Sequence, residues 1–314
     1  MPHETIRVEV NDKVATITLS RPARLNAYTG RMGIELFGAI HDLDRSGEVR
    51  AIVVTGEGRA FCAGADLEAG GSTFAGEPAY LEASAAEARI RPWNLSTPII
   101  GAINGPAVGI GATMPLWWDI RIASEKAKLG FVFTRRGLCP EANCTWLLPR
   151  MIGFARAMEI LVTGRMLSAE EALAYGLVSR VVPHDELLPA ALGIAQEIAK
   201  STAPVAVAAT RRLLWRQLLE ADPRLAKSLE DEVFRWLGSQ VDAAEGVTAF
   251  LEKRAPVWSM NAARDLPPML GDLIEDPILG GEPDTFEVEA APPTERSDTL
   301  LEERLHSLRT FRER

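Results

Sequence analysis

The sequence predicts an α/β fold in which helices pack on a mostly parallel sheet. Short β-branched runs alternate with longer segments of helical periodicity through the first half of the chain. Several of these runs are apolar at every position, which is typical of strands buried on both faces. With 314 residues, 25% of them charged, the chain has the size of one large domain with appendages, or of two domains.

The first half of the chain opens with a β-hairpin. Residues 6–10 and 14–19 alternate apolar and polar around Asn11-Asp12. Apolar residues at helical spacing then predict a helix over 29–43. The elements expected after it are a buried strand at 51–58, a helix over 77–94, and further strands at 98–103, 119–124 and 127–131.

The second half is mainly helical. Ser168 is a plausible N-cap, because Glu171 follows three residues later as in a capping box. The expected elements are helices over 155–163 and 168–175, a strand at 177–182, and helices over 186–201, 204–219, 222–237 and 241–253. Residues 271–299 are rich in Pro, Gly, Asp and Glu, which predicts a loop or linker before a charged helix over 300–314.

Composition excludes several function classes. A formal net charge of −9 argues against a nucleic-acid or anionic-membrane partner. No apolar stretch is long enough to span a bilayer and the N-terminal residues lack a signal pattern, so we expect a cytoplasmic protein. Three scattered cysteines and four isolated histidines predict neither a disulfide framework nor a metal site.

Two segments share one design, a buried strand followed by a small-residue turn and a helix. The first leads from Ile52–Thr55 into Phe61–Leu67, and the second leads from Ile99–Ile103 into Asn104–Thr113. Amide N–H groups at a helix N-terminus have no intrahelical partner. Two such amides that point at one site would form an oxyanion hole.

The order of these segments resembles the crotonase superfamily, the enoyl-CoA hydratase/isomerase family. The resemblance includes RPARLNAYT (21–29), WDIRIAS (118–124), RRGLCPE (135–141) and GVTAFLEKRAP (246–256), and covers about residues 5–256. It implies a spiral of ββα units over residues 1–200 and a helical oligomerisation region over 201–258. Residues 259–314 would be an acidic tail. It also implies a homotrimer or a hexamer built from two trimers.

The resemblance implies roles for named residues. The oxyanion amides would be those of Ala63 and Ile110, and Gly64 would leave room for the ligand to approach the backbone. Many hydratases have Gly where this chain has Ile110. The residues expected to contact CoA are Arg24, Ala65, Asp66, Leu67 and Lys253, the last from a neighbouring subunit. CoA would be part of the substrate, and no other cofactor is expected.

The reaction depends on carboxylates. The two glutamates of hydratases fall on Thr113 and Phe133, neither of which can act as base or acid near neutral pH. Glu141 remains, at the position of the single base of Δ3,Δ2-enoyl-CoA isomerases and of the nucleophile of 4-chlorobenzoyl-CoA dehalogenases, and we expect it at the start of a helix.

A double-bond isomerase with Glu141 as base is therefore the leading hypothesis. A hydratase or thioester hydrolase, a dehalogenase-like enzyme, and a non-catalytic acyl-CoA-binding module stay open. Arg135 and Arg136 are expected to pair with carboxylates such as Asp119.

Overall fold

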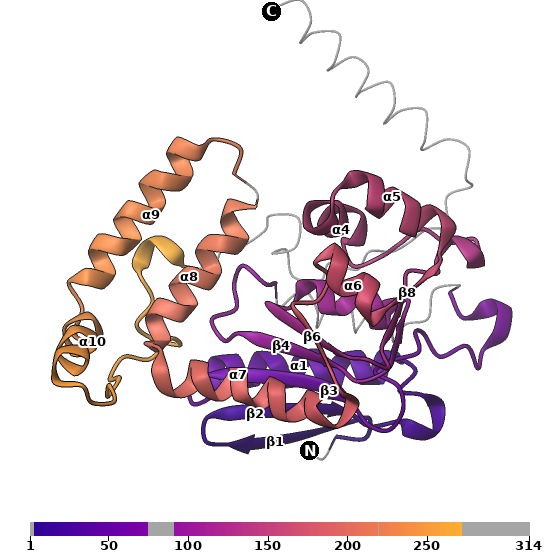
Figure 1. Cartoon of the computed structure of the whole chain (residues 1–314), viewed down its shortest axis with the longest axis horizontal. Coiled ribbons are helices and arrows are strands. Elements are labelled where there is room, and N and C mark those ends of the chain that lie inside the picture. The colour runs from indigo at the N-terminus through magenta and orange to yellow at the C-terminus, as the bar shows by residue number, and fades with distance from the viewer. Residues whose placement is uncertain (1–2, 75–90, 219, 272–314) are drawn as a thin grey trace, which may run out of the picture. The chain divides into compact units, whose positions relative to one another are not determined.

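A six-stranded sheet organises the protein (Figure 1). The computed structural model describes residues 3–74, 91–218 and 220–271. The strands are, in spatial order, β1 (Ile6–Asn11), β2 (Val14–Leu19), β3 (Ala51–Gly56), β4 (Ile99–Ile103), β6 (Ile120–Ser124) and β9 (Arg180–Val182). Only β1 and β2 pair antiparallel, as the predicted hairpin requires, and the other neighbours are parallel.

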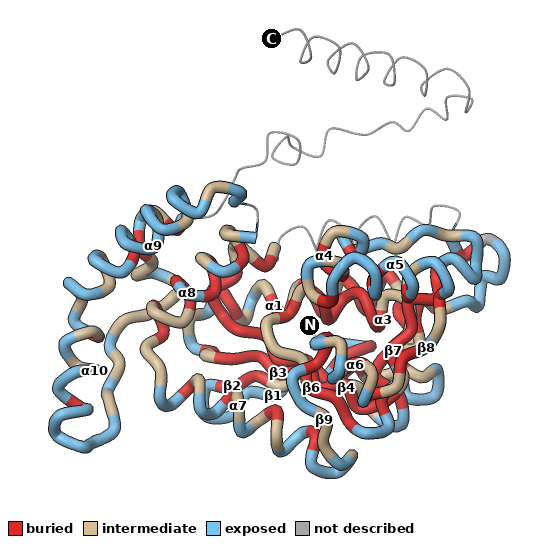
Figure 2. Tube along the Cα trace, turned by 45° about the horizontal axis from the view of Figure 1, so that its top comes forward, coloured by how far each residue is buried: buried red, intermediate tan, exposed pale blue. Residues whose placement is uncertain are grey.

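The central strands β3 and β4 are buried on both faces, which confirms the interpretation of their apolar runs (Figure 2), whereas the edge strand β1 is largely exposed. In β3, Ile52 and Val54 belong to the main core, whereas Ala51 and Val53 face a second cluster. Helix α1 (Gly30–Ser46), N-capped by Thr29, contributes to the main core. Helix α7 (Leu187–Ser201) covers the second face with buried residues four apart, namely Leu187, Ala191, Ala195 and Ala199.

A second, three-stranded sheet lies beside the first. It consists of β5 (Pro106–Val108), β7 (Lys128–Gly130) and β8 (Met166–Ser168). The sequence predicted β7 but neither β5 nor β8. Strand β9 is also shorter than predicted, since Leu177 and Val178 form the buried turn before it.

The remaining helices follow the predicted pattern closely. Helix α6 (Ala169–Tyr175) has both halves of the predicted capping box at Ser168 and Glu171. The other helices are α3 (Ile110–Thr113), α4 (Cys144–Ile152), α5 (Phe154–Thr163), α8 (Pro204–Gln217), α9 (Pro223–Gly238) and α10 (Val241–Glu252). Most of the helix predicted over 77–94 lies outside the described residues, and so does the tail from residue 272.

A buried ion pair fastens the C-terminal helices to the sheet. Arg211 of α8 donates to Asp119 at 2.9 Å, and the Trp215 indole donates to the same carboxylate at 3.0 Å. The Asp119 carboxylate therefore pairs with Arg211 and Trp215 of α8. The expected pairing with Arg135 or Arg136 is wrong. The predicted tail boundary is also too early, since Leu270 is fully buried beside Ala209 and Val233.

No helix in the described ranges is long and apolar enough to cross a membrane.

Glu35 of α1 fixes the N-terminal segment to the core. Its carboxylate accepts bonds from the N–H of Glu4 at 3.0 Å, from the N–H of Thr5 at 2.9 Å and from Arg31 Nε at 2.8 Å. The Thr5 hydroxyl donates to it at 2.6 Å. Burial opposes ionisation, but these bonds outweigh burial and lower the pKa of Glu35 to about 2.

This pKa predicts an acid-sensitive contribution to stability. Because the folded pKa lies below the ordinary value of 4.5, the contribution is present above that pH and is lost as the pH falls toward 2. Glu35→Gln should lower the free energy of unfolding by up to roughly 3 kcal/mol at pH 7. Urea unfolding over a pH series should show this difference shrinking between about pH 5 and 3. A difference that stays constant over that range would contradict the pKa argument.

Candidate active site

A cavity of about 270 Å³ opens where three chain segments meet. The segments are residues 63–67, residues 108–110 and residues 132–141, and Tyr28 and Phe74 complete the wall. Both small-residue turns singled out in the sequence contribute to it. The lining residues are Tyr28, Ala63, Gly64, Ala65, Leu67, Phe74, Val108, Gly109, Ile110, Val132, Phe133, Arg136, Leu138 and Glu141.

The first segment presents the amide of Ala65 to this cavity. Tyr28 N–H donates to Gly64 O, and Asp66 N–H donates to Tyr28 O, each at 2.8 Å. N–H directions alternate along an extended chain, so the Ala65 N–H turns away from Tyr28. It forms no hydrogen bond with any residue that the structure describes.

Ala63 was expected to supply this donor, and that expectation is wrong. Its N–H donates to the Leu25 carbonyl at 3.0 Å, so it is already used within the fold. The unused amide lies two residues further on, at Ala65. The segment also differs from the prediction in not leading directly into a helix, since only a 3₁₀ turn at Gly70–Ser72 follows in the part of the chain that is described.

The second segment presents the amide of Ile110. This residue opens α3, where the first N–H groups have no intrahelical acceptor. Gly109 N–H is bonded to Gly130 O at 2.8 Å, and Thr113 N–H is bonded to Gly109 O at 3.0 Å. The Ile110 N–H has no acceptor among the described residues. Two unused amides therefore belong to the wall of one cavity.

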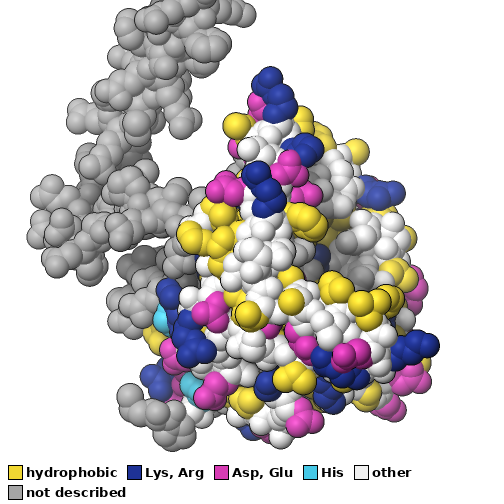
Figure 3. Space-filling view, turned by 90° about the vertical axis from the view of Figure 1, so that its left-hand side faces the viewer, with side chains coloured by type: hydrophobic (Ala, Val, Ile, Leu, Met, Phe, Trp, Pro, Cys, Tyr) yellow, Lys and Arg dark blue, Asp and Glu magenta, His cyan; other side chains and the backbone are white. Residues whose placement is uncertain are grey.

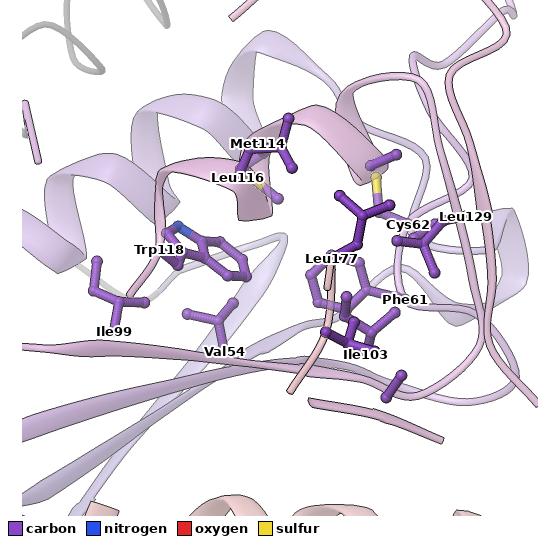
Figure 4. Close-up of a cluster of buried hydrophobic side chains, with 14 of the residues drawn as sticks. Val54, Phe61, Cys62, Ile99, Ile103, Met114, Leu116, Trp118, Leu129 and Leu177 are labelled. Atoms are coloured by element: carbon purple, nitrogen blue, oxygen red, sulfur yellow. The ribbon is translucent and has the colours of Figure 1, made fainter. Parts of the chain in front are cut away.

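Glycines allow the two segments to come this close. A Cβ atom on Gly111 would lie 2.2 Å from Cys62 O, and one on Gly64 (φ +100°) would lie 3.0 Å from Val108 O. The segments are joined by a bond from Val108 N–H to Cys62 O at 2.9 Å. Figure 4 shows Phe61 and Cys62 embedded among core side chains such as Ile103 and Leu129.

Glu141 is the one acidic side chain in the described wall of the cavity. The buried hydroxyl of Thr113 donates a short hydrogen bond to its Oε1. Glu141 was expected at the start of a helix, but α4 begins at Cys144, after Ala142 and Asn143, which both have positive φ (50° and 51°). Such a backbone is costly for residues other than glycine and is concentrated at functional sites.

The family resemblance assigns the positions of the two hydratase glutamates to Thr113 and Phe133. Phe133 lines the cavity, and Thr113 contacts it through Glu141.

The residues expected to contact CoA differ in their placement. Ala65 and Leu67 line the cavity, and Leu67 is half exposed. Asp66 does not line it and pairs with Arg21 at 2.8 Å, while Arg24 pairs with Glu68 at 3.2 Å on the surface. Lys253 ends α10 and does not line the cavity of its own chain.

Arg136 is a cavity residue that the sequence prediction missed. It lies in the 3₁₀ turn Thr134–Arg136, exposed at the wall of the cavity. The sequence alone does not show which of the two adjacent arginines faces the cavity. In the structure, Arg135 points elsewhere and donates to Thr163 O at 2.8 Å.

The two buried cysteines near the site are poor nucleophiles. Burial, together with the charge of Glu141, raises the pKa of Cys144 to about 12, and burial raises that of Cys62 to about 11. Both thiols therefore stay protonated at neutral pH. No cluster of His, Cys, Asp and Glu suited to a metal ion occurs among the described residues.

Comparison with known proteins gives the family. The model of the enoyl-CoA hydratase/isomerase family matches residues 9–261, which is most of the chain. The chain belongs to the enoyl-CoA hydratase/isomerase family. Its fold is accordingly the crotonase fold, as the order of the two small-residue segments predicted.

Relatives in this family carry different names. An enoyl-CoA hydratase of Alternaria alternata is 39% identical over 246 residues, covering 78% of this chain and 82% of that protein. The 1,2-epoxyphenylacetyl-CoA isomerase of Escherichia coli is 36% identical, covering 82% and 98%. Among solved structures, a probable enoyl-CoA hydratase/isomerase from Mycobacterium abscessus matches with a TM-score of 0.76 and 38% identity, covering 81% of this chain and 98% of that one.

Gly111→Ala should test the backbone contact beneath the cavity. The new methyl group cannot fit 2.2 Å from Cys62 O, so the substitution should lower the free energy of unfolding by at least about 1–3 kcal/mol, measured in urea. Gly38→Ala is a matched control, because a Cβ at Gly38 in α1 meets nothing within 4 Å. That variant should be more stable by about 0.5–1 kcal/mol. Equal effects at the two glycines would contradict the close approach.

Proposed function

We propose that this protein acts on acyl-CoA thioesters and stabilises their enolate form between the amides of Ala65 and Ile110. The observation that carries the proposal is the meeting of two unused backbone amides and one carboxylate, Glu141, in a single cavity. A thioester oxygen gains negative charge when a proton leaves the neighbouring carbon. Each donor aimed at that oxygen is worth about 2.7–4 kcal/mol in comparable sites.

Within this class we propose a double-bond isomerase. The Glu141 carboxylate takes a C2 proton from a 3-enoyl thioester, and the electron pair moves into a dienolate whose charge rests on the thioester oxygen. The same carboxyl group returns the proton to C4, which leaves the double bond between C2 and C3. Proton and electrons balance, and the chain supplies every group, so no cofactor beyond the CoA of the substrate is needed.

The residues around Glu141 favour isomerisation over hydration. Hydration needs a group that activates water as well as one that protonates carbon. The resemblance places the two hydratase glutamates at Thr113 and Phe133, and neither side chain can perform these roles. The Thr113 hydroxyl instead donates to Glu141 and holds its carboxylate in one orientation. The names of the relatives include hydratases and an isomerase, so this choice rests on the residues.

The proposed contacts to CoA follow from which residues line the cavity and which are already paired. Arg136 lies at the cavity wall, where its guanidinium can meet phosphate oxygens. Arg24 and Asp66 are engaged in ion pairs, so we propose that the backbone around Ala65 and Leu67 contributes more than their side chains. Lys253 would contribute only from a neighbouring subunit. The cytoplasmic location expected from the sequence stays a prediction.

Hydrogen exchange tests the role of Glu141. The wild-type protein in D₂O should exchange the α-protons of butyryl-CoA, followed by mass spectrometry. Glu141→Gln keeps the shape of the side chain but removes the base, so exchange should fall by about 10²–10⁴-fold. Glu125→Gln is the control, because Glu125 is exposed in the turn after β6, outside the cavity wall, and should leave exchange unchanged.

The outcomes separate the competing functions. Exchange that survives in Glu141→Gln would contradict the assigned base. Absent exchange in the wild type, with butyryl-CoA still bound, would favour a nucleophilic Glu141 or a binding module. Absent binding would contradict the proposed substrate class.

We further propose that the protein assembles into a trimer or a hexamer. Large apolar side chains gather on the C-terminal helices, and Figure 3 shows this side of the molecule. Phe250 is 82% exposed, Phe234 is 76% exposed and Leu251 is 72% exposed. Exposed apolar groups of this size concentrate at subunit interfaces.

Light scattering after size exclusion should give three or six times the chain mass of 34.2 kDa. Phe250→Glu in α10 should lower that mass, because a charge would have to be buried at the interface. Val10→Glu, an equally polar change at an exposed valine of β1, should not. A monomeric wild type would contradict the assembly.

A further inference from the structure

A second cavity, called here the rear cavity, shares a wall residue with the first, called here the front cavity. It has a volume of only about 20 Å³, close to that of one water molecule. Side chains of α1, of the 3₁₀ turn Met114–Trp117 and of residues 91–99 form most of its wall. The lining residues are Phe37, Arg91, Leu95, Ile99, Ile110, Met114, Trp117, Trp118 and Ala142.

Ile110 is the residue that the described walls of both cavities share. Gly109, which precedes it, lines only the front cavity. Met114, four residues after Ile110, lines only the rear cavity. On the opposite side, Glu141 belongs to the front wall and Ala142 to the rear wall. Ile110 therefore lies at the boundary between the two spaces, next to the proposed reacting groups.

The rear cavity is suited to hydrocarbon. The Trp117 indole N–H donates to Ala142 O at 2.7 Å. Because the polar atom of this ring already has a partner, Trp117 offers the cavity mainly apolar surface. Trp93 packs against Trp117 with ring centroids 6.0 Å apart, and the Arg91 guanidinium lies 5.7 Å from the Trp117 ring centroid. Figure 4 shows Met114 and Trp118 lying over Ile99 and Val54 in the same apolar layer.

The backbone does not require a large side chain at position 110. Gly109 needs its positive φ of 55°, and Gly111 needs to lack a Cβ because of Cys62 O. Ile110, between them, opens α3 in ordinary helical geometry, which any residue adopts. Its amide would serve the thioester equally well with a smaller side chain, so the size of the side chain calls for a separate explanation.

We propose that Ile110 limits the length of the acyl group, because its side chain closes the passage from the front cavity to the apolar rear cavity. The inference rests on the proposed function and adds a substrate class to it, namely thioesters of short acyl chains. A longer chain meets the isoleucine side chain, whereas truncation at this position joins the two cavities and admits further methylenes.

The test is the dependence of affinity on chain length. Dissociation constants of acetyl-, butyryl-, hexanoyl- and octanoyl-CoA are measured by calorimetry for the wild type, Ile110→Val and Ile110→Ala. In the wild type, affinity should stop rising at a short chain. In Ile110→Ala, affinity should continue to rise to hexanoyl-CoA, by up to roughly fourfold for each methylene that enters apolar space. Ile110→Val should lie between the two and guards against a folding defect in the smaller variant.

Met114→Ala is the matched control. It enlarges the rear cavity behind an intact isoleucine, so the chain-length profile should remain that of the wild type. In combination with Ile110→Ala, it should extend the rise to longer chains.

A profile of Ile110→Ala that coincides with the wild type, or a wild type whose affinity rises through octanoyl-CoA, would overturn the inference and leave the proposed function standing. If none of the four thioesters binds to any folded variant, the proposed function itself fails, and this inference fails with it.

Discussion

The site depends on one constraint, the close contact between the backbones of residues 59–65 and 105–111. The two segments exchange direct hydrogen bonds, and Gly105 and Gly111 lack the Cβ atoms that would strike Arg59 O and Cys62 O at 2.1 and 2.2 Å. This contact brings the Ala65 and Ile110 amides to the same cavity. Side chains can change around it, but the positions of the two donors are set by backbone packing, which is rigid in a close-packed interior.

Much of this arrangement could be predicted from local sequence. The apolar run of β3 predicted a strand buried on both faces, and Ser168 with Glu171 predicted the start of α6. The order of the small-residue segments also predicted the family. The direction of each N–H could not be predicted, because it depends on distant partners. The Leu25 carbonyl accepts the Ala63 N–H, and the bonds of Tyr28 to Gly64 and Asp66 orient Ala65. Neither contact can be predicted from the FCAGADL motif itself. The same holds for β5 and β8, which exist because β7 lies between them.

The composition of the cavity limits its chemistry. In the proposed reaction, Thr113 and Phe133 stand where the resemblance places the hydratase glutamates, so proton transfer falls to Glu141 alone. The hydroxyl of Thr113 gives that carboxylate a fixed partner, and the positive φ of Ala142 and Asn143 sets the path of the chain beside it. Under the two proposals, Ile110 combines two properties in one residue, a backbone donor for the thioester and a side chain that bounds the space for the acyl group. Substrate range and reaction type would therefore change independently, through different residues of the same small wall.

The central claim is that the Ala65 and Ile110 amides polarise a thioester carbonyl. Difference infrared spectroscopy of butyryl-CoA labelled with ¹³C at the thioester carbon measures this polarisation directly. We predict a carbonyl stretch at lower frequency in the complex than in water, because two fixed donors weaken the C=O bond. The shift should persist in Glu141→Gln, since the donors belong to the backbone. A bound carbonyl that vibrates at or above its frequency in water would contradict the account.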